Sequence, residues 1–307
     1  MFAGVSGKMK EKTLRLAAAV CLAVSAALLS ICINQAIRLS RLEKTAAAET
    51  SKLEQAQSQI GELKKELAEK EKPGGNVPTA AARKFSYDAK KVQGSGPKIA
   101  YLTFDDGPTK NTPLLLSTLK SLNVRATFFV VGVNCQKFPD AVRQEASAGH
   151  AVGIHSWTHQ YSYIYASMTD FMQDFNRLRN YVTQQLGREP DICRFPGGTN
   201  NTVSLRYGRD HIMRQVVRQV ESMNIRPIDW NVSPEDAVER VPSSGTIVRR
   251  VIRQTGGQHR PVILLHDLSR STNTVYAVPQ IVRSLRAKGY SFGILTAETQ
   301  AVMFEPS

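Results

Sequence analysis

From residue 98 onward, short apolar runs alternate with longer amphipathic segments. The runs that predict strands cover residues 99–104, 126–131, 151–155, 192–195, 227–232, 262–266 and 292–295. Most of them are separated by segments whose apolar residues recur at helical spacing, for example 113–122, 169–186 and 212–223. Strands that alternate with helices are joined by crossover connections, which make neighbouring strands parallel. The pattern therefore predicts an α/β domain over residues 98–307 with seven parallel strands.

Polar residues follow these apolar runs in a regular way. The C-terminal ends of the predicted strands carry Asp105, Asp106, His155, Arg194, Asp229 and His266. In a β/α barrel, this is the face at which several strands contribute to one active site. An open doubly wound sheet also uses this edge, but fewer of its strands reach one crevice. The number of strand ends involved therefore favours a barrel over an open sheet.

A different pattern precedes this domain. Residues 16–33 carry no charge and no Pro or Gly, and basic residues come before them. A run of this length nearly crosses the hydrocarbon layer, which is about 30 Å thick, and the basic flank favours a cytoplasmic N-terminus. A cleaved signal peptide is the alternative, but the run is long for one and no small-x-small site follows closely. We expect a cytoplasmic tail at 1–15, an uncleaved single-pass anchor in the cell membrane at 16–36, and an extracellular catalytic domain.

Residues 37–72 change to a heptad-like pattern. Apolar residues fill one heptad position at 39, 46, 53, 60 and 67, whereas Glu49 and Lys70 interrupt the second. Two sound heptads fit either a short dimerising coiled coil or a single solvated helix, and the pattern does not decide between them. Residues 73–97 begin and end with Pro and Gly and are expected to be a linker.

Charge and cysteines narrow the class of protein. The net charge of +14 suits an anionic partner such as an acidic wall polymer. The arginines are scattered over predicted helices with few aromatic residues between them, which argues against nucleic-acid binding. None of the four cysteines forms a Cys-x-x-Cys pair, so a zinc–thiolate site is not expected. Cys135 and Cys193 are expected to be separate thiols, because the strands beside them are not expected to be neighbours.

Two histidines and two aspartates suggest a metal-dependent hydrolase. His155 and His159 are four residues apart, so one segment can present both imidazoles to one ion. Asp106 would add an oxygen ligand, and such a set leaves positions open for water and substrate, as in catalytic zinc sites. Several divalent ions suit these ligands, and Zn²⁺ is the one we expect. Asp105 leaves the strand end in another direction and can act as a general base. Glycoside hydrolysis is disfavoured, because it needs carboxyls about 5 to 9.5 Å apart across the bond.

The remaining polar positions complete a hydrolytic site. Arg194 ends a strand and could hold Asp105 ionised. His266 is the remaining histidine at a strand end and the natural general acid. An exposed N–H in a glycine-rich loop can bind a developing oxyanion, and apolar side chains can form a wall for a methyl group or a sugar face. The residues expected in these two roles are Gly197, Trp230 and Leu264.

The order of five motifs resembles a known family. The motifs are Thr103-Phe-Asp-Asp-Gly, His155-Ser-x-x-His, Arg194-x-Pro-Gly-Gly, Asp229-Trp-Asn and Leu264-Leu-His-Asp. Over about residues 98–300 they closely resemble the polysaccharide deacetylases of carbohydrate esterase family four. The resemblance implies a distorted seven-stranded barrel and metal-dependent removal of N-acetyl groups from amino sugars. It implies that Asp105 is the base, that Arg194 orients it and that His266 protonates the leaving amine. It assigns the metal to Asp106, His155 and His159.

One position departs from the family pattern. Relatives with Asp-Trp-Asn-Val commonly continue with another Asp, where this chain has Ser233. In parts of the family that residue helps to tune the acid histidine. The residues that could take over this role are Asp229, Asp236 and Asp267, and the sequence does not choose among them.

Together these features predict an exported, membrane-tethered N-deacetylase of cell-wall glycan. The third motif resembles the membrane-anchored branch that acts on bacterial peptidoglycan, which makes that polymer the expected substrate. The alternatives are an O-acetyl esterase on xylan or a related polymer, and a catalytically inactive wall-binding or sensor protein on the same fold. The complete set of polar strand-end residues argues against the inactive protein.

Overall fold

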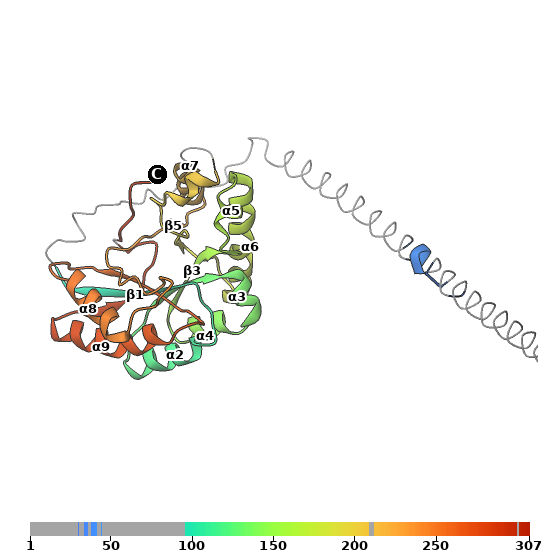
Figure 1. Ribbon diagram of the computed structural model, residues 1–307. Helices are drawn as coiled ribbons and strands as arrows, with labels where there is room; N and C mark the ends of the chain where they lie inside the picture. The colour runs from blue at the N-terminus through green and yellow to red at the C-terminus, as the bar shows by residue number, and fades with distance from the viewer. Residues whose placement is uncertain are drawn as a thin grey trace, which may run out of the picture. The chain divides into compact units, whose positions relative to one another are not determined.

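The computed structural model describes residues 96–208, 212–299 and 301–307, together with residues 30, 34–35, 38–41 and 44. Within these residues, seven strands form one parallel sheet (Figure 1). They are β1 (Ile99–Asp105), β2 (Thr127–Val131), β3 (Ala151–Ser156), β4 (Ile192–Cys193), β5 (Arg226–Pro227), β6 (Val262–His266) and β7 (Ser291–Gly293). Their order is β5-β4-β3-β2-β1-β6, and β7 also pairs with β1. The predicted α/β class with seven parallel strands is confirmed.

Helices connect the strands and cover the sheet (Figure 1). They are α2 (Thr112–Ser121), α3 (Gly132–Lys137), α4 (Ala141–Ser147), α5 (Tyr161–Ile164), α6 (Met168–Leu186), α7 (Ile212–Ser222), α8 (Ser244–Gln254) and α9 (Asn273–Ala287), with a 3₁₀ turn at Val203–Arg206. The long helix α6 has clear sequence limits. The Ser167 side chain accepts a hydrogen bond from the Asp170 N–H at its start, and Gly187 adopts φ of 68° at its end.

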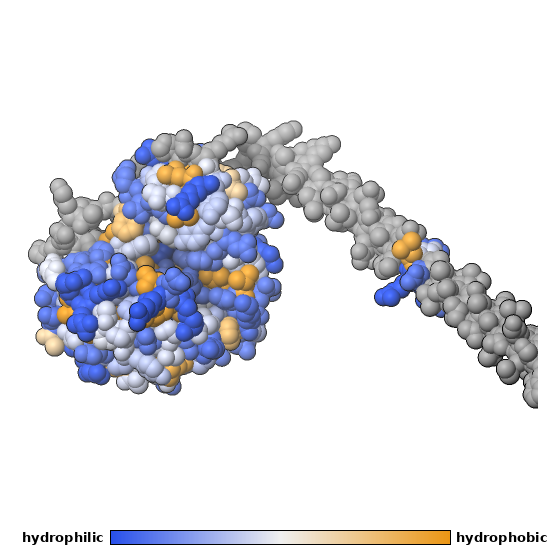
Figure 2. All heavy atoms as spheres, in the orientation of Figure 1, coloured by the Kyte–Doolittle hydropathy of each residue, from blue (hydrophilic) through white to orange (hydrophobic). Residues whose placement is uncertain are grey.

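Strands β1 to β6 are almost wholly buried, unlike β7, and alternate residues belong to two different apolar clusters. Along β1, Ala100, Leu102 and Phe104 belong to the larger cluster, which includes the helix side chains. The smaller cluster comprises Tyr101, Phe129, Ala151, Ile192, Ile228, Val262, Leu295 and Ala301. Side chains alternate across a strand, so Thr103 and Asp105 share the face of Tyr101. The smaller cluster is therefore the inner core, below the polar strand ends. The visible outer surface is mostly hydrophilic, with small separate apolar patches (Figure 2).

The segment after β5 joins the two edges of the sheet. The Ile228 N–H donates to the Cys193 carbonyl at 2.9 Å, and Val232 forms a parallel bridge with Ile263 of β6. The Asn231 side chain also accepts a hydrogen bond from the Val262 N–H at 2.7 Å. This connection between β5 and β6 is consistent with a (β/α) barrel.

Two of the predicted strands are shorter than expected. The predicted strand 227–232 consists of only Arg226–Pro227 and the later single bridge. Pro227 has no N–H to donate, and the Asp229 N–H donates to the Val302 carbonyl at 2.8 Å, away from the sheet. The predicted strand 192–195 ends at Cys193. In both places the strand ends early and the irregular stretch that follows carries residues of the predicted site.

The chain divides into two units, residues 1–78 and 79–307. Among the described residues, no helix is both long enough and apolar enough to cross a membrane. The predicted anchor at 16–36, stalk at 37–72 and linker at 73–97 lie almost entirely outside the described residues. These three predictions stay predictions.

Candidate active site

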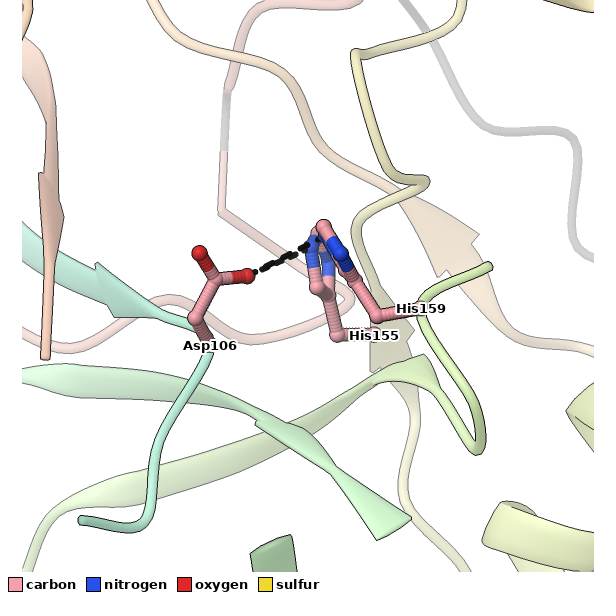
Figure 3. Close-up of side chains that lie close together, drawn as sticks. All are labelled: Asp106, His155 and His159. Atoms are coloured by element: carbon pink, nitrogen blue, oxygen red, sulfur yellow. Dashed lines mark ion pairs between the residues drawn. The ribbon is translucent and has the colours of Figure 1, made fainter. Parts of the chain in front are cut away.

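Three of the predicted site residues meet at the C-terminal ends of β1 and β3. The Asp106 Oδ1 atom lies 3.4 Å from His155 Nε2 and 3.2 Å from His159 Nε2. One ligand atom from each of the three residues lies within 4.8 Å of the others. Figure 3 shows both imidazoles facing the carboxylate. The expected metal-binding set is thus brought together at the ends of two strands, β1 and β3, which flank β2 in the sheet.

The backbone at this site is strained. Asp106 has φ of 71° and His159 has φ of 56°, a region that residues other than glycine seldom adopt. The turn that carries His159 is held by Asp174 of α6, which accepts hydrogen bonds from the Ser156 hydroxyl at 2.8 Å and the Thr158 N–H at 2.9 Å. The Ser156 hydroxyl oxygen in turn accepts from the His159 N–H at 2.9 Å. Sequence reasoning missed Asp174, because it looks like an ordinary polar residue of a surface helix.

The environment of the three residues fits a divalent cation. His155 Nδ1 lies 2.7 Å from the Arg194 carbonyl, which can only accept, so Nδ1 carries the hydrogen and Nε2 presents a lone pair. The Asp106 Oδ1 atom is buried and makes no hydrogen bond to any described residue. Burial alone would raise the pKa of Asp106, yet His155 and His159 hold it well below its usual range. A buried, ionised acceptor without a donor is the ligand that a cation would satisfy.

Arg194 directly follows β4, is fully buried, and its side chain connects β1 with the segment after β5. Its Nη1 donates to Asp105 Oδ1 at 2.9 Å and to the Thr103 hydroxyl at 2.6 Å. Its other nitrogens donate to the carbonyls of Ile228 and Asp229, both at 3.0 Å. Asp105 itself is only 3% exposed. The arginine therefore fixes one oxygen of Asp105 and neutralises its charge, in the arrangement that the sequence suggested.

Replacing Arg194 with methionine should lower the free energy of unfolding by about 3–5 kcal/mol, because it leaves the Asp105 carboxylate buried without its cation. Urea denaturation monitored by circular dichroism measures this loss. The matched control is Arg143→Met, which removes an exposed ion pair with Asp140 and should change stability by at most about 1 kcal/mol. Equal losses for the two variants would contradict the role given to Arg194.

His266 at the end of β6 is held by Asp236. The His266 Nδ1 atom lies 2.8 Å from Asp236 Oδ1, and the His266 N–H donates to Oδ2 at 2.9 Å. The Thr274 hydroxyl also donates to Oδ2, at 2.8 Å, and Asp236 is fully buried. Burial would lower the pKa of His266, but the hydrogen bond and charge of Asp236 raise it to about 9. Of the three aspartates considered for tuning this histidine, Asp236 is the one in contact with it.

The other two aspartates have different partners. Asp229 accepts hydrogen bonds from the Thr199 N–H at 3.0 Å and the Phe304 N–H at 2.7 Å, which links the residue after the third motif to the segment 301–307. Asp267 accepts from the Thr109 hydroxyl at 2.7 Å and so fixes the loop after β1. Ser233, where the family pattern has an aspartate, exchanges two hydrogen bonds with the Gln254 side chain. The sequence did not distinguish these three aspartates as partners of His266, and the structure shows that each has different hydrogen-bond partners.

The residues expected to contact substrate lie near these groups. Gly197 is exposed, has φ of 80°, and its N–H makes no hydrogen bond to any described residue. Trp230 packs over the neighbouring Gly198, where an added Cβ would lie 3.0 Å from the indole. The Phe304 ring meets Trp230 edge-on at 5.2 Å. Leu264 is buried and shares the inner face of β6 with His266.

Comparisons with known proteins show the family to which the chain belongs. The family model of polysaccharide deacetylases matches residues 93–216. A peptidoglycan-N-acetylglucosamine deacetylase of Bacillus cereus is 34% identical over 204 residues, which are 66% of this chain and 71% of that relative. The chain belongs to the polysaccharide deacetylase family. The resemblance to this family that the motifs predicted is therefore confirmed.

Two further members of the polysaccharide deacetylase family are informative. The crystal structure of the catalytic domain of a peptidoglycan N-acetylglucosamine deacetylase from Eubacterium rectale superposes with a TM-score of 0.66 at 38% identity, covering 70% of this chain and 96% of that one. The peptidoglycan-N-acetylmuramic acid deacetylase PdaC of Bacillus subtilis is 31% identical over 195 residues, which are 63% of this chain and 37% of PdaC. Relatives of this chain thus carry names for either amino sugar.

The two described cysteines, Cys135 and Cys193, are buried and free, as expected. Burial raises the pKa of both thiols, which keeps them uncharged. They contribute no ligand to the metal-binding set.

Tyr161, at the start of α5, is a site residue that sequence reasoning missed. Its ring lies 5.6 Å from the His159 ring, nearly perpendicular to it. Burial raises the pKa of Tyr161 to about 12, and the carboxylates of Asp106 and Asp105 add to the rise, so the phenol is protonated at neutral pH. Nothing in the sequence distinguishes it from Tyr163 and Tyr165, which follow at alternate positions in the same segment.

Proposed function

We propose that this chain is a metal-dependent N-deacetylase that hydrolyses the acetamido groups of amino sugars in cell-wall glycan, with peptidoglycan as substrate. The observation that carries the proposal is the register of β1 and β6. Asp105 and His266 are direct partners across these strands, beside Asp106 and the two histidines. A base held by arginine, an acid held by aspartate and a metal-binding set are thus adjacent. The names of the Bacillus cereus and Eubacterium rectale relatives support the choice of substrate.

The residues divide the hydrolysis between them. A divalent cation held by Asp106, His155 and His159, for which we propose Zn²⁺, supplies Lewis acidity toward water and the acetamide carbonyl. Asp105 accepts a proton from the attacking water, whose oxygen forms the new bond to the carbonyl carbon. Arg194 orients Asp105 by donating to its Oδ1 atom at 2.9 Å, which leaves the other carboxylate oxygen to accept the proton.

His266 and Gly197 act at the other atoms of the scissile amide. The exposed Gly197 N–H donates to the carbonyl oxygen as negative charge develops on it. His266 is protonated at neutral pH because Asp236 raises its pKa to about 9, so it can donate a proton to the nitrogen as the C–N bond breaks. The products are acetate and a free amine on the sugar. Trp230 and Leu264 are proposed to form the apolar wall beside the acetyl methyl group.

We further propose that residues 16–36 anchor the enzyme in the cell membrane, with the catalytic domain outside, and that residues 37–72 form a stalk able to dimerise. The uncharged run 16–33, the basic residues before it and the heptad pattern support this arrangement. Recovery of the full chain in the soluble fraction after cell lysis would contradict the anchor. Cross-linking that finds only monomers in membranes would contradict the dimer.

Acetate release tests the proposed activity and separates it from its alternatives. The purified protein should release acetate from N-acetylated peptidoglycan and leave an equal amount of free amine. The release should stop when EDTA removes the metal and return with added Zn²⁺. Faster release from O-acetylated xylan would show an esterase instead. No acetate from either polymer, with or without metal, would contradict catalysis altogether.

A further inference from the structure

We propose that the hydroxyl of Tyr161 is a further catalytic group, which donates a hydrogen bond to the carbonyl oxygen of the substrate's acetamido group beside the Gly197 N–H. This inference rests on the proposed deacetylase function and adds a residue to it. None of the five sequence motifs contains Tyr161, which lies two residues beyond the last histidine of the second motif.

The position of the phenol is the first part of the argument. A Cβ placed on Gly197 would lie 3.3 Å from the Tyr161 hydroxyl and 3.4 Å from its ring. The phenol oxygen therefore lies beside the loop that carries the exposed Gly197 N–H, which makes no hydrogen bond to any described residue. The same ring contacts His159, a member of the metal-binding set, at 5.6 Å between centroids. Tyr161 thus connects the metal-binding set to the proposed oxyanion donor.

The glycine at position 197 makes this arrangement possible. A side chain there would meet both Tyr161 and the Cβ of Asn201, the latter at 3.0 Å, and the φ of 80° also favours glycine. The loop consequently leaves open a space that the tyrosine fills. Because Gly197 has no side chain, the Tyr161 hydroxyl can lie beside it.

The hydroxyl of Tyr161 is also free, unlike that of its neighbour in the aromatic row. Tyr165 is fully buried and donates to the Pro196 carbonyl at 2.7 Å, which is a structural role. Tyr161 is partly exposed, and its hydroxyl makes no hydrogen bond to any described residue. A phenol held by aromatic packing but without a protein partner can donate to a ligand.

The charges around the site determine what that ligand atom is. Asp105 and Asp106 offer only acceptors, so they cannot hydrogen-bond a carbonyl oxygen or stabilise its developing negative charge. A carbonyl oxygen has two lone pairs and can accept from two donors at once. The Gly197 N–H and the Tyr161 hydroxyl are two neutral donors in adjacent positions, the arrangement that stabilises an oxyanion.

Tyr161→Phe tests the inference, with Tyr163→Phe as the matched control from the same short helix. Tyr161→Phe should lower kcat by about 10²-fold with KM nearly unchanged, the effect expected when one oxyanion donor is removed. The affinity of the zinc-loaded protein for acetate, measured by calorimetry, should fall by about tenfold, the loss expected for one hydrogen bond. Tyr163→Phe should match the native protein in both measurements. Zinc affinity and thermal unfolding should be the same for all three proteins.

Three results would overturn the inference. Native kcat and native acetate affinity in Tyr161→Phe would show that the hydroxyl does not contact the acetamide. A loss of zinc affinity in this variant would show instead that Tyr161 only positions His159. If the native protein releases no acetate, the proposed function fails, but the calorimetric comparison still decides on Tyr161, since equal acetate affinities would rule out the contact.

Discussion

Replacing Asp105 with asparagine should lower the rate of acetate release by about 10³-fold, within the range of 10² to 10⁴ that removal of a general base typically produces. Asparagine has the same shape and can still accept the hydrogen bond that Arg194 Nη1 donates at 2.9 Å. It cannot accept a proton from water at neutral pH. The loss should therefore fall on kcat, while KM for the glycan stays nearly unchanged.

The control for this experiment is Asp191→Asn. Asp191 lies just before β4, at the opposite end of the strands from the site, and its side chain accepts from the Ala297 N–H at 3.3 Å. The Asp191→Asn substitution removes one negative charge, as Asp105→Asn does, but does not touch the catalytic residues. Acetate release should therefore be unchanged. Zinc affinity, measured by calorimetry, should be native in both variants, because Asp106 and the two histidines are intact. An Asp105→Asn protein that keeps more than about a tenth of the native rate would exclude Asp105 as the base.

The sequence predicted the strands and the residues at their ends because both depend on local pattern. Side chains alternate between the two faces of a strand, and Asp105 and His266 lie on the inner faces of β1 and β6 as the last residues of these strands. Parallel strands end at one edge, so residues far apart in the chain were expected to converge. The pairing of Arg194 with Asp105, separated by 89 positions, follows from this rule.

The partners of these residues could not be predicted, since they come from loops and helices whose placement has no local signal. Asp236 reaches His266 from an irregular stretch 30 positions earlier. From the sequence, Asp229 and Asp267 were equally suitable partners for this histidine. Asp174 holds the His159 turn from the middle of α6, where polar residues are commonplace. The contact of Phe304 with Trp230 depends on where the segment 301–307 packs. Each depends on tertiary packing, which a single sequence does not reveal.

The same reasoning explains why β4 and β5 were predicted too long. Apolar composition extended both predictions into 195 and 232, but backbone hydrogen bonding ended the strands earlier. The guanidinium of Arg194 takes the carbonyls of Ile228 and Asp229, which a continuing ladder would have used. The irregular backbone after β5 thus supplies two carbonyls to the buried arginine that also holds Asp105.

Replacing Asp236 with asparagine should shift the alkaline limb of the pH–rate profile to lower pH by about 1 to 3 units, the range for loss of one adjacent opposite charge. In the native protein Asp236 raises the pKa of His266 to about 9, so the acid form persists well above neutral pH. Without the carboxylate, His266 would lose its proton nearer its ordinary value of 6.5. The rate at pH 8 should then fall, while the rate at pH 6 changes less. Profiles of kcat/KM between pH 6 and 10 measure the shift.

The sign of the stability effect follows from the same pKa. A histidine whose pKa is raised on folding contributes stability that is complete below its unfolded value and disappears as pH rises through the folded value. The difference in free energy of unfolding between native protein and Asp236→Asn should therefore be largest below pH 6.5 and decrease toward pH 9.

Glu239→Gln is the control, because it removes an exposed charge three residues away. It should change neither the pH–rate profile nor the pH dependence of stability. His266→Gln should lose about 10²- to 10⁴-fold in rate and abolish the alkaline limb. An Asp236→Asn protein with the native limb would show that this aspartate does not set the proton affinity of the acid.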